Sequence, residues 1–307
     1  MEKIIRIGTR ESQLAVWQAT QVKELLAEHG FPAELVYIKS EGDIDLRTPL
    51  YEMGVQGIFT RSLDIALLND RIDIAVHSMK DVPTQLPEGI RSAAVLKRGP
   101  VNDLLVFKTD TEFLQYKDRP ASIATSSIRR KAQWLHKYPA HQIHNLRGNV
   151  NTRLKKLQEE NWNAAIFAQA GLERIGLRPE KSRILDWMLP APAQGAIMVV
   201  CREQDEYSWN ASRLFNDPDT ALCTKIERDF LRVLLGGCST PISALAETGG
   251  AELYFRGNIL STDGSQKVEI EKVIPVEKAD HTGKTAAEEI LSLGGKEIAD
   301  SIQHAGK

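Results

Sequence analysis

The chain has 307 residues, of which 42% are hydrophobic and 26% charged, and its formal net charge is -2. This length and composition predict a globular protein of two or three domains. The nearly balanced charge excludes an overall field that would draw the protein to nucleic acid or anionic lipid, so any basic site has to be local.

Two further features bound the class of protein. The N-terminal residues MEKIIRIGTR lack the apolar stretch of a signal peptide, and no apolar run reaches about 18 residues, so we expect a cytoplasmic protein without membrane partners. Its three cysteines, Cys201, Cys223 and Cys238, form no CxxC pair. That argues against a disulfide framework and a structural zinc site, and we expect no metal.

The first hundred residues alternate predicted strands and helices. Apolar runs predict strands at 4–8, 34–39 and 72–76, and helical spacing predicts helices at 12–28 and 59–68. Ser12 is the expected N-cap of the first helix. Strands that alternate with helices predict a parallel sheet with right-handed crossovers.

A second unit of the same design follows residue 102. Its predicted elements are strands 104–107, 122–124, 142–145 and 164–168 and helices 127–137 and 151–160. A continuous apolar run at 196–201 predicts a strand that returns to the first sheet.

The last ninety residues change character. An amphipathic helix through Leu222, Ile226 and Phe230 leads to LLGGCSTPIS at 234–243. Strands at 243–246, 252–260 and 267–274, the turn at 262–265 and a helix at 282–302 complete a predicted α+β module. The expected fold is therefore α/β, with two βαβ domains, 1–98 with 196–216 and 99–195, flanking a cleft and a smaller C-terminal domain at 217–307.

Cys238 follows two glycines that end the preceding helix, so a bulky group has room to approach its sulfur. A helix C-terminus does not stabilise a thiolate, which argues against a redox or protease-type nucleophile and favours an attachment point for a prosthetic group. A small buried hydrophobe is the alternative.

Polar side chains follow most of the predicted strands, where ligands bind in open α/β sheets. Between Arg119 and Gln158 there are nine Lys or Arg residues and no Asp or Glu, which predicts an anionic ligand. Arg129, Arg130, Arg147 and Arg153 are the candidates, since guanidinium pairs with carboxylate; the lysines fit a solvated face. Asp81, after a strand in HSMKDVP, is expected to stabilise a cation or move a proton, with a surface turn residue as the alternative.

These stretches together resemble the porphobilinogen deaminase (hydroxymethylbilane synthase) family over nearly the whole chain. Seven motifs carry the resemblance, namely GTRESQLAVWQA (8–19), HSMKDVP (77–83), ATSSIRRKAQ (124–133), LRGNVNTRL (146–154), AGLERIG (170–176), AQGA (193–196) and LLGGCSTPI (234–242). The resemblance implies two domains like the halves of periplasmic binding proteins and a third that bears the cysteine. It also implies a monomer of heme and tetrapyrrole biosynthesis that condenses four porphobilinogen molecules, releases ammonia and liberates hydroxymethylbilane.

The resemblance also implies roles for individual residues. Cys238 would carry a dipyrromethane cofactor through a thioether, and Asp81 would be the catalytic carboxylate that also contacts the cofactor. The implied cofactor contacts are Lys80, Thr125, Ser126, Ser127, Arg129, Arg130, Arg147, Gly148, Asn149 and Arg153. The implied substrate contacts are Arg10, Ser12, Arg147, Arg153, Ala170, Arg174, Gln194 and Gly195.

Some positions depart from the family pattern, and two other functions are weighed against it. Gln56 stands where a lysine is usual, Ser62 where a glutamate is usual and Ala193 where a glycine is usual. A non-enzymatic, bilobal protein that binds small anions would share the cleft, and a nucleic-acid binder would use the basic segment. Neither alternative explains the GGC motif.

Overall fold

The computed structural model describes residues 3–39, 60–234 and 240–305, with side chains up to residue 302. Among these residues one compact unit contains the chain up to Gly99 together with Gly195–Leu222, and a second contains Pro100–Gln194 and the chain from Cys223 onward. No helix in the described part of the chain is long and apolar enough to cross a membrane.

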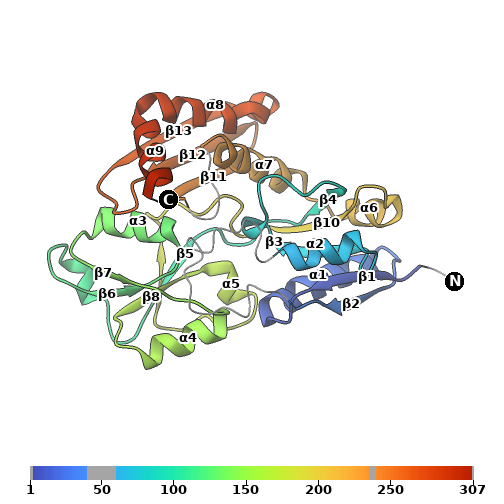
Figure 1. Cartoon of the computed structure of the whole chain (residues 1–307), viewed down its shortest axis with the longest axis horizontal. Helices are drawn as coiled ribbons and strands as arrows, with labels where there is room; N and C mark the ends of the chain where they lie inside the picture. The colour runs from blue at the N-terminus through green and yellow to red at the C-terminus, as the bar shows by residue number, and fades with distance from the viewer. Residues whose placement is uncertain (1–2, 40–59, 235–239, 306–307) are drawn as a thin grey trace. The chain divides into compact units, whose positions relative to one another are not determined.

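The first unit is built on a mixed five-stranded sheet of order β2-β1-β3-β10-β4 (Figure 1). Its strands are β1 (Ile5–Thr9), β2 (Ala33–Tyr37), β3 (Ile74–Ser78), β4 (Ile90–Val95) and β10 (Ile197–Arg202). Its helices are α1 (Gln13–Glu28), α2 (Arg61–Leu68), the 3-10 turn η2 (Met79–Asp81) and α6 (Glu206–Arg213). The return of β10 to this sheet is confirmed, and Ser12 caps α1 as predicted.

The predicted strands β1, β2 and β3 are parallel to one another, as expected. β10, for which no direction was predicted, runs antiparallel to β3 and to β4, so the complete sheet is mixed. β4 was not predicted, because its sequence IRSAAV is short and shows neither strict alternation nor a fully apolar run.

The second unit contains another mixed five-stranded sheet, of order β7-β6-β8-β5-β9. Its strands are β5 (Asp103–Phe107), β6 (Ser122–Ala124), β7 (Gln142–His144), β8 (Ala164–Ala168) and β9 (Ser182–Leu185), and its helices are the turn η3 (Glu112–Gln115), α3 (Ile128–Lys137), α4 (Val150–Glu159) and α5 (Gln169–Glu173). β6 is parallel to β7 and to β8, as expected, whereas β5 is antiparallel to both of its neighbours, which corrects the prediction for that strand. Residues of β5 alternate between two cores, Leu104 packing with Leu157 of α4 and Leu105 with Trp134 of α3.

The same unit ends in a three-stranded antiparallel sheet, β11 (Ile242–Gly249), β12 (Glu252–Leu260) and β13 (Lys267–Pro275). Helices α7 (Pro218–Val233), η4 (Val276–His281), α8 (Thr282–Ile290) and α9 (Lys296–Ala305) accompany it. The single predicted helix 282–302 is interrupted by a π-helical turn, η5 (Leu291–Gly295), where Gly294 has a φ of 102°. The turn of the β12–β13 hairpin packs closely on α3. A Cβ atom added to Gly264 would lie only 2.5 Å from the Ala132 carbonyl oxygen, so only glycine fits at this contact.

Candidate active site

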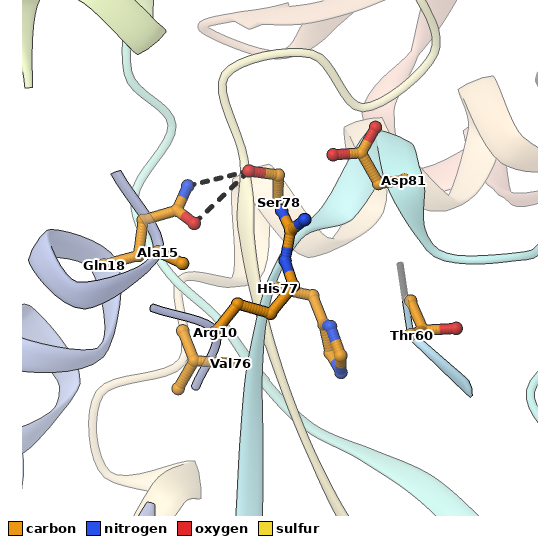
Figure 2. Close-up of a pocket in the computed structure, with 8 residues that line it drawn as sticks. All are labelled: Arg10, Ala15, Gln18, Thr60, Val76, His77, Ser78 and Asp81. Carbon is orange, nitrogen blue, oxygen red and sulfur yellow. Dashed lines mark hydrogen bonds between the residues drawn. The ribbon is translucent and has the colours of Figure 1, made fainter. Parts of the chain in front are cut away.

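A recess opens at one end of the first sheet, where two neighbouring parallel strands finish. β1 continues through Arg10 into α1, and β3, which pairs with β1, continues into η2. The recess has a volume of about 250 Å³, part of it open to solvent, and it is lined by Arg10, Ala15, Gln18, Thr60, Val76, His77, Ser78 and Asp81 (Figure 2). The ends of two parallel strands thus bring a guanidinium and a carboxylate to one small space, as expected for this type of sheet.

Uncharged polar groups hold one wall of the recess. Gln18, on a buried turn of α1, donates through Nε2 to Ser78 Oγ at 2.9 Å, and the Ser78 hydroxyl lies 3.3 Å from Gln18 Oε1. Ser12 accepts a hydrogen bond from the Ala15 backbone N–H at 3.4 Å and so caps the helix. The contacts between Gln18 and Ser78 fix α1 against the end of β3, where Ser78 precedes the turn that carries Lys80 and Asp81.

His77 is a polar group of the recess that the sequence analysis did not select. Its side chain is buried, and its Nε2 has no hydrogen-bond partner among the described residues. Burial, and then the charge of Arg10, lowers the pKa of His77 to about 3. The imidazole is therefore neutral at physiological pH and adds no positive charge beside Arg10.

Asp64 is a second acidic group near the recess that was not selected. It lies in the first turn of α2 and is buried, with a hydrogen bond to Thr60, which lines the recess. Burial raises the pKa of Asp64 to about 6. No sequence pattern distinguishes this aspartate from a solvated residue at a helix start.

The second unit brings together two of the predicted arginines around a carboxylate that was not predicted. Arg130 donates to Asp103 Oδ1 from Nε at 3.1 Å and from Nη2 at 2.8 Å, and Arg129 Nη2 lies 2.8 Å from Asp103 Oδ2. Gln194 donates to the same Oδ1 at 2.9 Å. Asp103 opens β5, far in sequence from the basic segment, so the acid-free run from Arg119 to Gln158 does not reveal this pairing.

The chemistry of this cluster fits an anionic ligand. Arg129, Arg130 and Asp103 are all nearly inaccessible to solvent, and two guanidinium groups share one carboxylate. Arg129 Nε is buried and has no hydrogen-bond partner in the described part of the chain. Burial lowers the pKa of Arg129 despite the charge of Asp103. A carboxylate bound here would balance the excess charge and accept from the open donor.

Helix N-termini carry the other predicted contacts. Ser127 accepts from the Arg130 backbone N–H and caps α3, and Asn149 accepts from the Thr152 N–H and caps α4. The Ser127 N–H in turn donates to Thr125 Oγ1 at 3.2 Å. Each cap pairs one N–H group of the first helical turn. The first turn of a helix has further N–H groups without a partner inside the helix, so both helix starts are suited to bind anions.

The side chain of Ser126 forms hydrogen bonds with the loop that leads to α4. Its hydroxyl donates to Asn145 Oδ1 at 2.5 Å and accepts from the Leu146 N–H at 2.9 Å. Further along this loop, Gly148 has a φ of 114°, and its carbonyl accepts from Arg153 Nε at 2.6 Å. Arg153 is thus anchored to the loop that it follows.

The remaining predicted residues differ in accessibility. Arg147 and Ala170 are buried, and burial lowers the pKa of Arg174 to about 10. Gly195 has a φ of 87°. Cys238 and Gln56 lie outside the described residues.

Comparison with known proteins identifies the chain. Residues 5–209 match the model of the porphobilinogen deaminase dipyrromethane cofactor binding domain, and residues 221–292 match the porphobilinogen deaminase C-terminal domain. The chain belongs to the porphobilinogen deaminase family. The sequence resemblance is thereby confirmed, and with it the enzyme class, the dipyrromethane cofactor and a place in tetrapyrrole biosynthesis.

Curated relatives of this deaminase match along nearly its whole length. The porphobilinogen deaminase of Pelobacter propionicus is 41% identical over 305 residues, covering 97% of each chain. The chloroplastic porphobilinogen deaminase of Oryza sativa subsp. japonica is 42% identical over 314 residues, covering 98% of this chain and 87% of that protein.

Solved structures of other proteins are more distant. The methionine binding protein MetQ has a TM-score of 0.44 and 14% identity, covering 71% of this chain and 91% of that one. The VFT2 domain of Bordetella pertussis BvgS has a TM-score of 0.40 and 11% identity, covering 68% and 85%.

Proposed function

We propose that this deaminase condenses four porphobilinogen molecules in turn, releasing ammonia at each addition, and then hydrolytically liberates linear hydroxymethylbilane. The observation that carries the proposal is the recess in which Asp81 and Arg10 line the same space as the neutral His77. Loss of ammonia from the aminomethyl group of porphobilinogen leaves a cation, which a fixed carboxylate stabilises.

In this reaction Asp81 is the catalytic residue. Its carboxylate would face the cation, and it can hold the proton that the attacked pyrrole carbon gives up. Arg10 would bind a carboxylate of the incoming porphobilinogen. Because His77 is neutral, it adds no second positive charge beside the Arg10 guanidinium. Lys80 and Ser12 flank these groups in sequence and are proposed contacts of cofactor and substrate, respectively.

Dipyrromethane, bound through a thioether to Cys238, would supply the pyrrole carbon to which the first substrate is added. The proposed cofactor contacts in the second unit are the arginine cluster and the helix starts described above. The orphaned Arg129 Nε and the shared Asp103 carboxylate support this assignment, since a ligand carboxylate supplies what the cluster lacks. Arg174, with Ala170, Gln194 and Gly195, is assigned to substrate and product.

The mass of the intact chain tests the proposal directly. We expect a two-pyrrole addition that maps to Cys238 alone and is missing from Cys238→Ser. Cys201 and Cys223, which are buried, provide internal controls in the same digest. Active protein with an unmodified Cys238 would refute the assignment of the cofactor.

The proposal also includes three expectations about the domains, the oligomeric state and the location of the protein. They are the division into domains 1–98 with 196–216, 99–195 and 217–307, a monomeric state and a cytoplasmic location. Limited proteolysis, sedimentation and cell fractionation would test them in turn.

A further inference from the structure

The side chain of Gln133, on α3, bridges two other segments of the second unit. Its Nε2 donates to the Leu189 carbonyl and to Ser243 Oγ, both at 2.9 Å, and its Oε1 accepts from the Leu189 N–H at 2.9 Å. The side chain is 6% exposed. A buried amide that satisfies three contacts holds three segments in one arrangement, because each lost contact would leave a buried polar group unpaired.

Arg129 depends on the same carbonyl. It precedes Gln133 by four residues, so the two side chains leave α3 on one face. Arg129 Nη1 donates to the Leu189 carbonyl at 2.8 Å while its Nη2 contacts Asp103. The place of the Leu189 carbonyl therefore helps to set the orientation of the Arg129 guanidinium.

The segment that begins at Leu189 is also tied to β11. The Pro190 carbonyl accepts from the Ala244 N–H at 3.3 Å. Glu227 of α7 accepts from the Ala193 N–H at 2.6 Å through one oxygen and from the Ala246 N–H of β11 at 2.7 Å through the other. At its far end the segment carries Gln194, which donates to Asp103. One stretch of chain thus contacts both the arginine cluster and β11.

We propose that Gln133 is a positioning residue for cofactor assembly, setting Arg129 relative to the strand that follows Cys238. This inference rests on the proposed function, in which a group attached at Cys238 has a carboxylate bound by the cluster of Arg129, Arg130 and Asp103, with Arg129 as the contacting residue. β11 begins four residues after Cys238, at Ile242. Attachment and carboxylate binding have to be satisfied together, so their spacing has to be fixed before the cofactor forms.

The test compares two cross-links between the same two structural modules. Gln133→Met keeps the length of the side chain and removes all three contacts, whereas Ser243→Ala removes only the contact to β11. His136→Leu is the matched control, because His136 Nδ1 also joins α3 to the C-terminal sheet module, through the Gly264 carbonyl at 2.8 Å, without touching Leu189. Each full-length chain is produced in cells unable to make porphobilinogen and is then supplied with porphobilinogen.

The measured quantity is the rate at which intact chains gain the two-pyrrole mass. We expect Gln133→Met to load about tenfold more slowly than the wild type and Ser243→Ala about threefold more slowly, as for the loss of roughly one hydrogen bond or less. His136→Leu should load at the wild-type rate. Once loaded, the Gln133→Met enzyme should have the wild-type KM for porphobilinogen, since its altered contacts lie on the cofactor side; a general loss of structure would change both quantities.

Each alternative result is distinct. Equal slowing in Gln133→Met and His136→Leu would mean that docking of the C-terminal sheet matters and that Arg129 is not specifically positioned, which overturns the inference. Wild-type loading in Gln133→Met also overturns it. If that variant does not fold, Ser243→Ala decides, and wild-type loading there has the same meaning. A wild-type chain that never gains mass on Cys238 would instead contradict the proposed function itself.

Discussion

Arg130 donates two hydrogen bonds to a single oxygen of Asp103, from Nε and from Nη2, while its Nη1 donates to the Ile166 carbonyl at 3.0 Å. All of its nitrogens are thereby engaged within the second unit. Arg129 differs, because its Nε has no partner among the described residues. The two neighbouring arginines are therefore unlike: Arg130 orders the carboxylate, and Arg129 retains a donor for a ligand.

The first prediction separates arginines that assemble the cofactor from those that bind substrate. Arg130→Leu should give mostly apo protein, because Asp103 loses its main partner and the charge excess of the cluster disappears. Arg174→Leu should keep the two-pyrrole adduct and accumulate chains heavier by one to three further pyrroles. Mass analysis after limited addition of porphobilinogen distinguishes the two, and a fully loaded, processive Arg130→Leu enzyme would contradict this division.

The second prediction concerns Asp81 in the recess. Asp81→Asn keeps the shape of the side chain but cannot hold a negative charge, so turnover should fall by roughly two to four orders of magnitude while the adduct remains. Ammonia release at saturating porphobilinogen, together with intact mass, measures both quantities. Gln85→Leu, an exposed change four residues on, is the control and should leave both unchanged. Near-normal turnover in Asp81→Asn would return this residue to the role of a turn aspartate.

Much of this fold follows from local sequence, and the errors have identifiable causes. The strands β6, β8 and β12 are predicted correctly, because each is an apolar or alternating segment bounded on both sides by residues typical of turns. The direction of a strand within its sheet is not determined by the strand's own sequence. β5 and β10 are apolar runs, as expected for strands buried on both faces, and such a run can be parallel or antiparallel to its neighbours. The helix 282–302 has good periodicity, but Gly294 enters a left-handed conformation that interrupts it.

The candidate site shows the same limit. Asp81 and the arginines can be selected from the sequence as candidates, because they follow predicted strands or stand in motifs, and their roles are predictions. Asp103, Gln133 and His77 were missed, since each gains its meaning from a partner distant in sequence or from burial. The sequence does not distinguish a buried, neutral histidine from a histidine exposed to solvent.

The third prediction follows from one departure from the family pattern. Ala193 has a φ of 61°, a left-handed conformation that opposes a Cβ, at the position where a glycine is usual. Ala193→Gly should therefore increase the free energy of unfolding by about 1 kcal/mol, the relieved strain exceeding the entropy that glycine adds to the unfolded chain. Urea unfolding measures the change.

The neighbouring Ala196 provides the control for this substitution. It is also buried, but it is not among the described residues with a positive φ. Ala196→Gly should therefore lower stability. If Ala193→Gly lowers it as well, the strain at residue 193 is smaller than its φ indicates.

The last prediction concerns acid stability and the ion cluster around the buried Asp73 in the first unit. Asp73 receives hydrogen bonds from the Arg6 N–H and Nε, both at 2.9 Å, and lies 3.2 Å from Arg202 Nη2. Burial opposes the charged carboxylate, but the hydrogen bonds from Arg6 and the charges of Lys3 and Arg6 outweigh it and hold the pKa of Asp73 well below its usual range. Its contribution to stability is thus complete above the unfolded pKa of about 4 and is lost as the pH falls below that value.

Asp73→Asn should consequently lower the free energy of unfolding at pH 7 by about 2 kcal/mol, as for lost hydrogen bonds to a charged group, because its cationic partners Arg6 and Arg202 are partly exposed and are rehydrated. The difference from the wild type should shrink as the pH falls from 4 toward 2. Asp64→Asn is a control of opposite sign, because burial raises the pKa of Asp64 to about 6. The ionised Asp64 destabilises the fold progressively as the pH rises from about 4 through 6, so its replacement should increase stability at pH 7 and have little effect at pH 4. Urea unfolding at pH 7, 4 and 3 measures all three chains, and a deficit in Asp73→Asn that is independent of pH would mean that shape, not charge, gives Asp73 its importance.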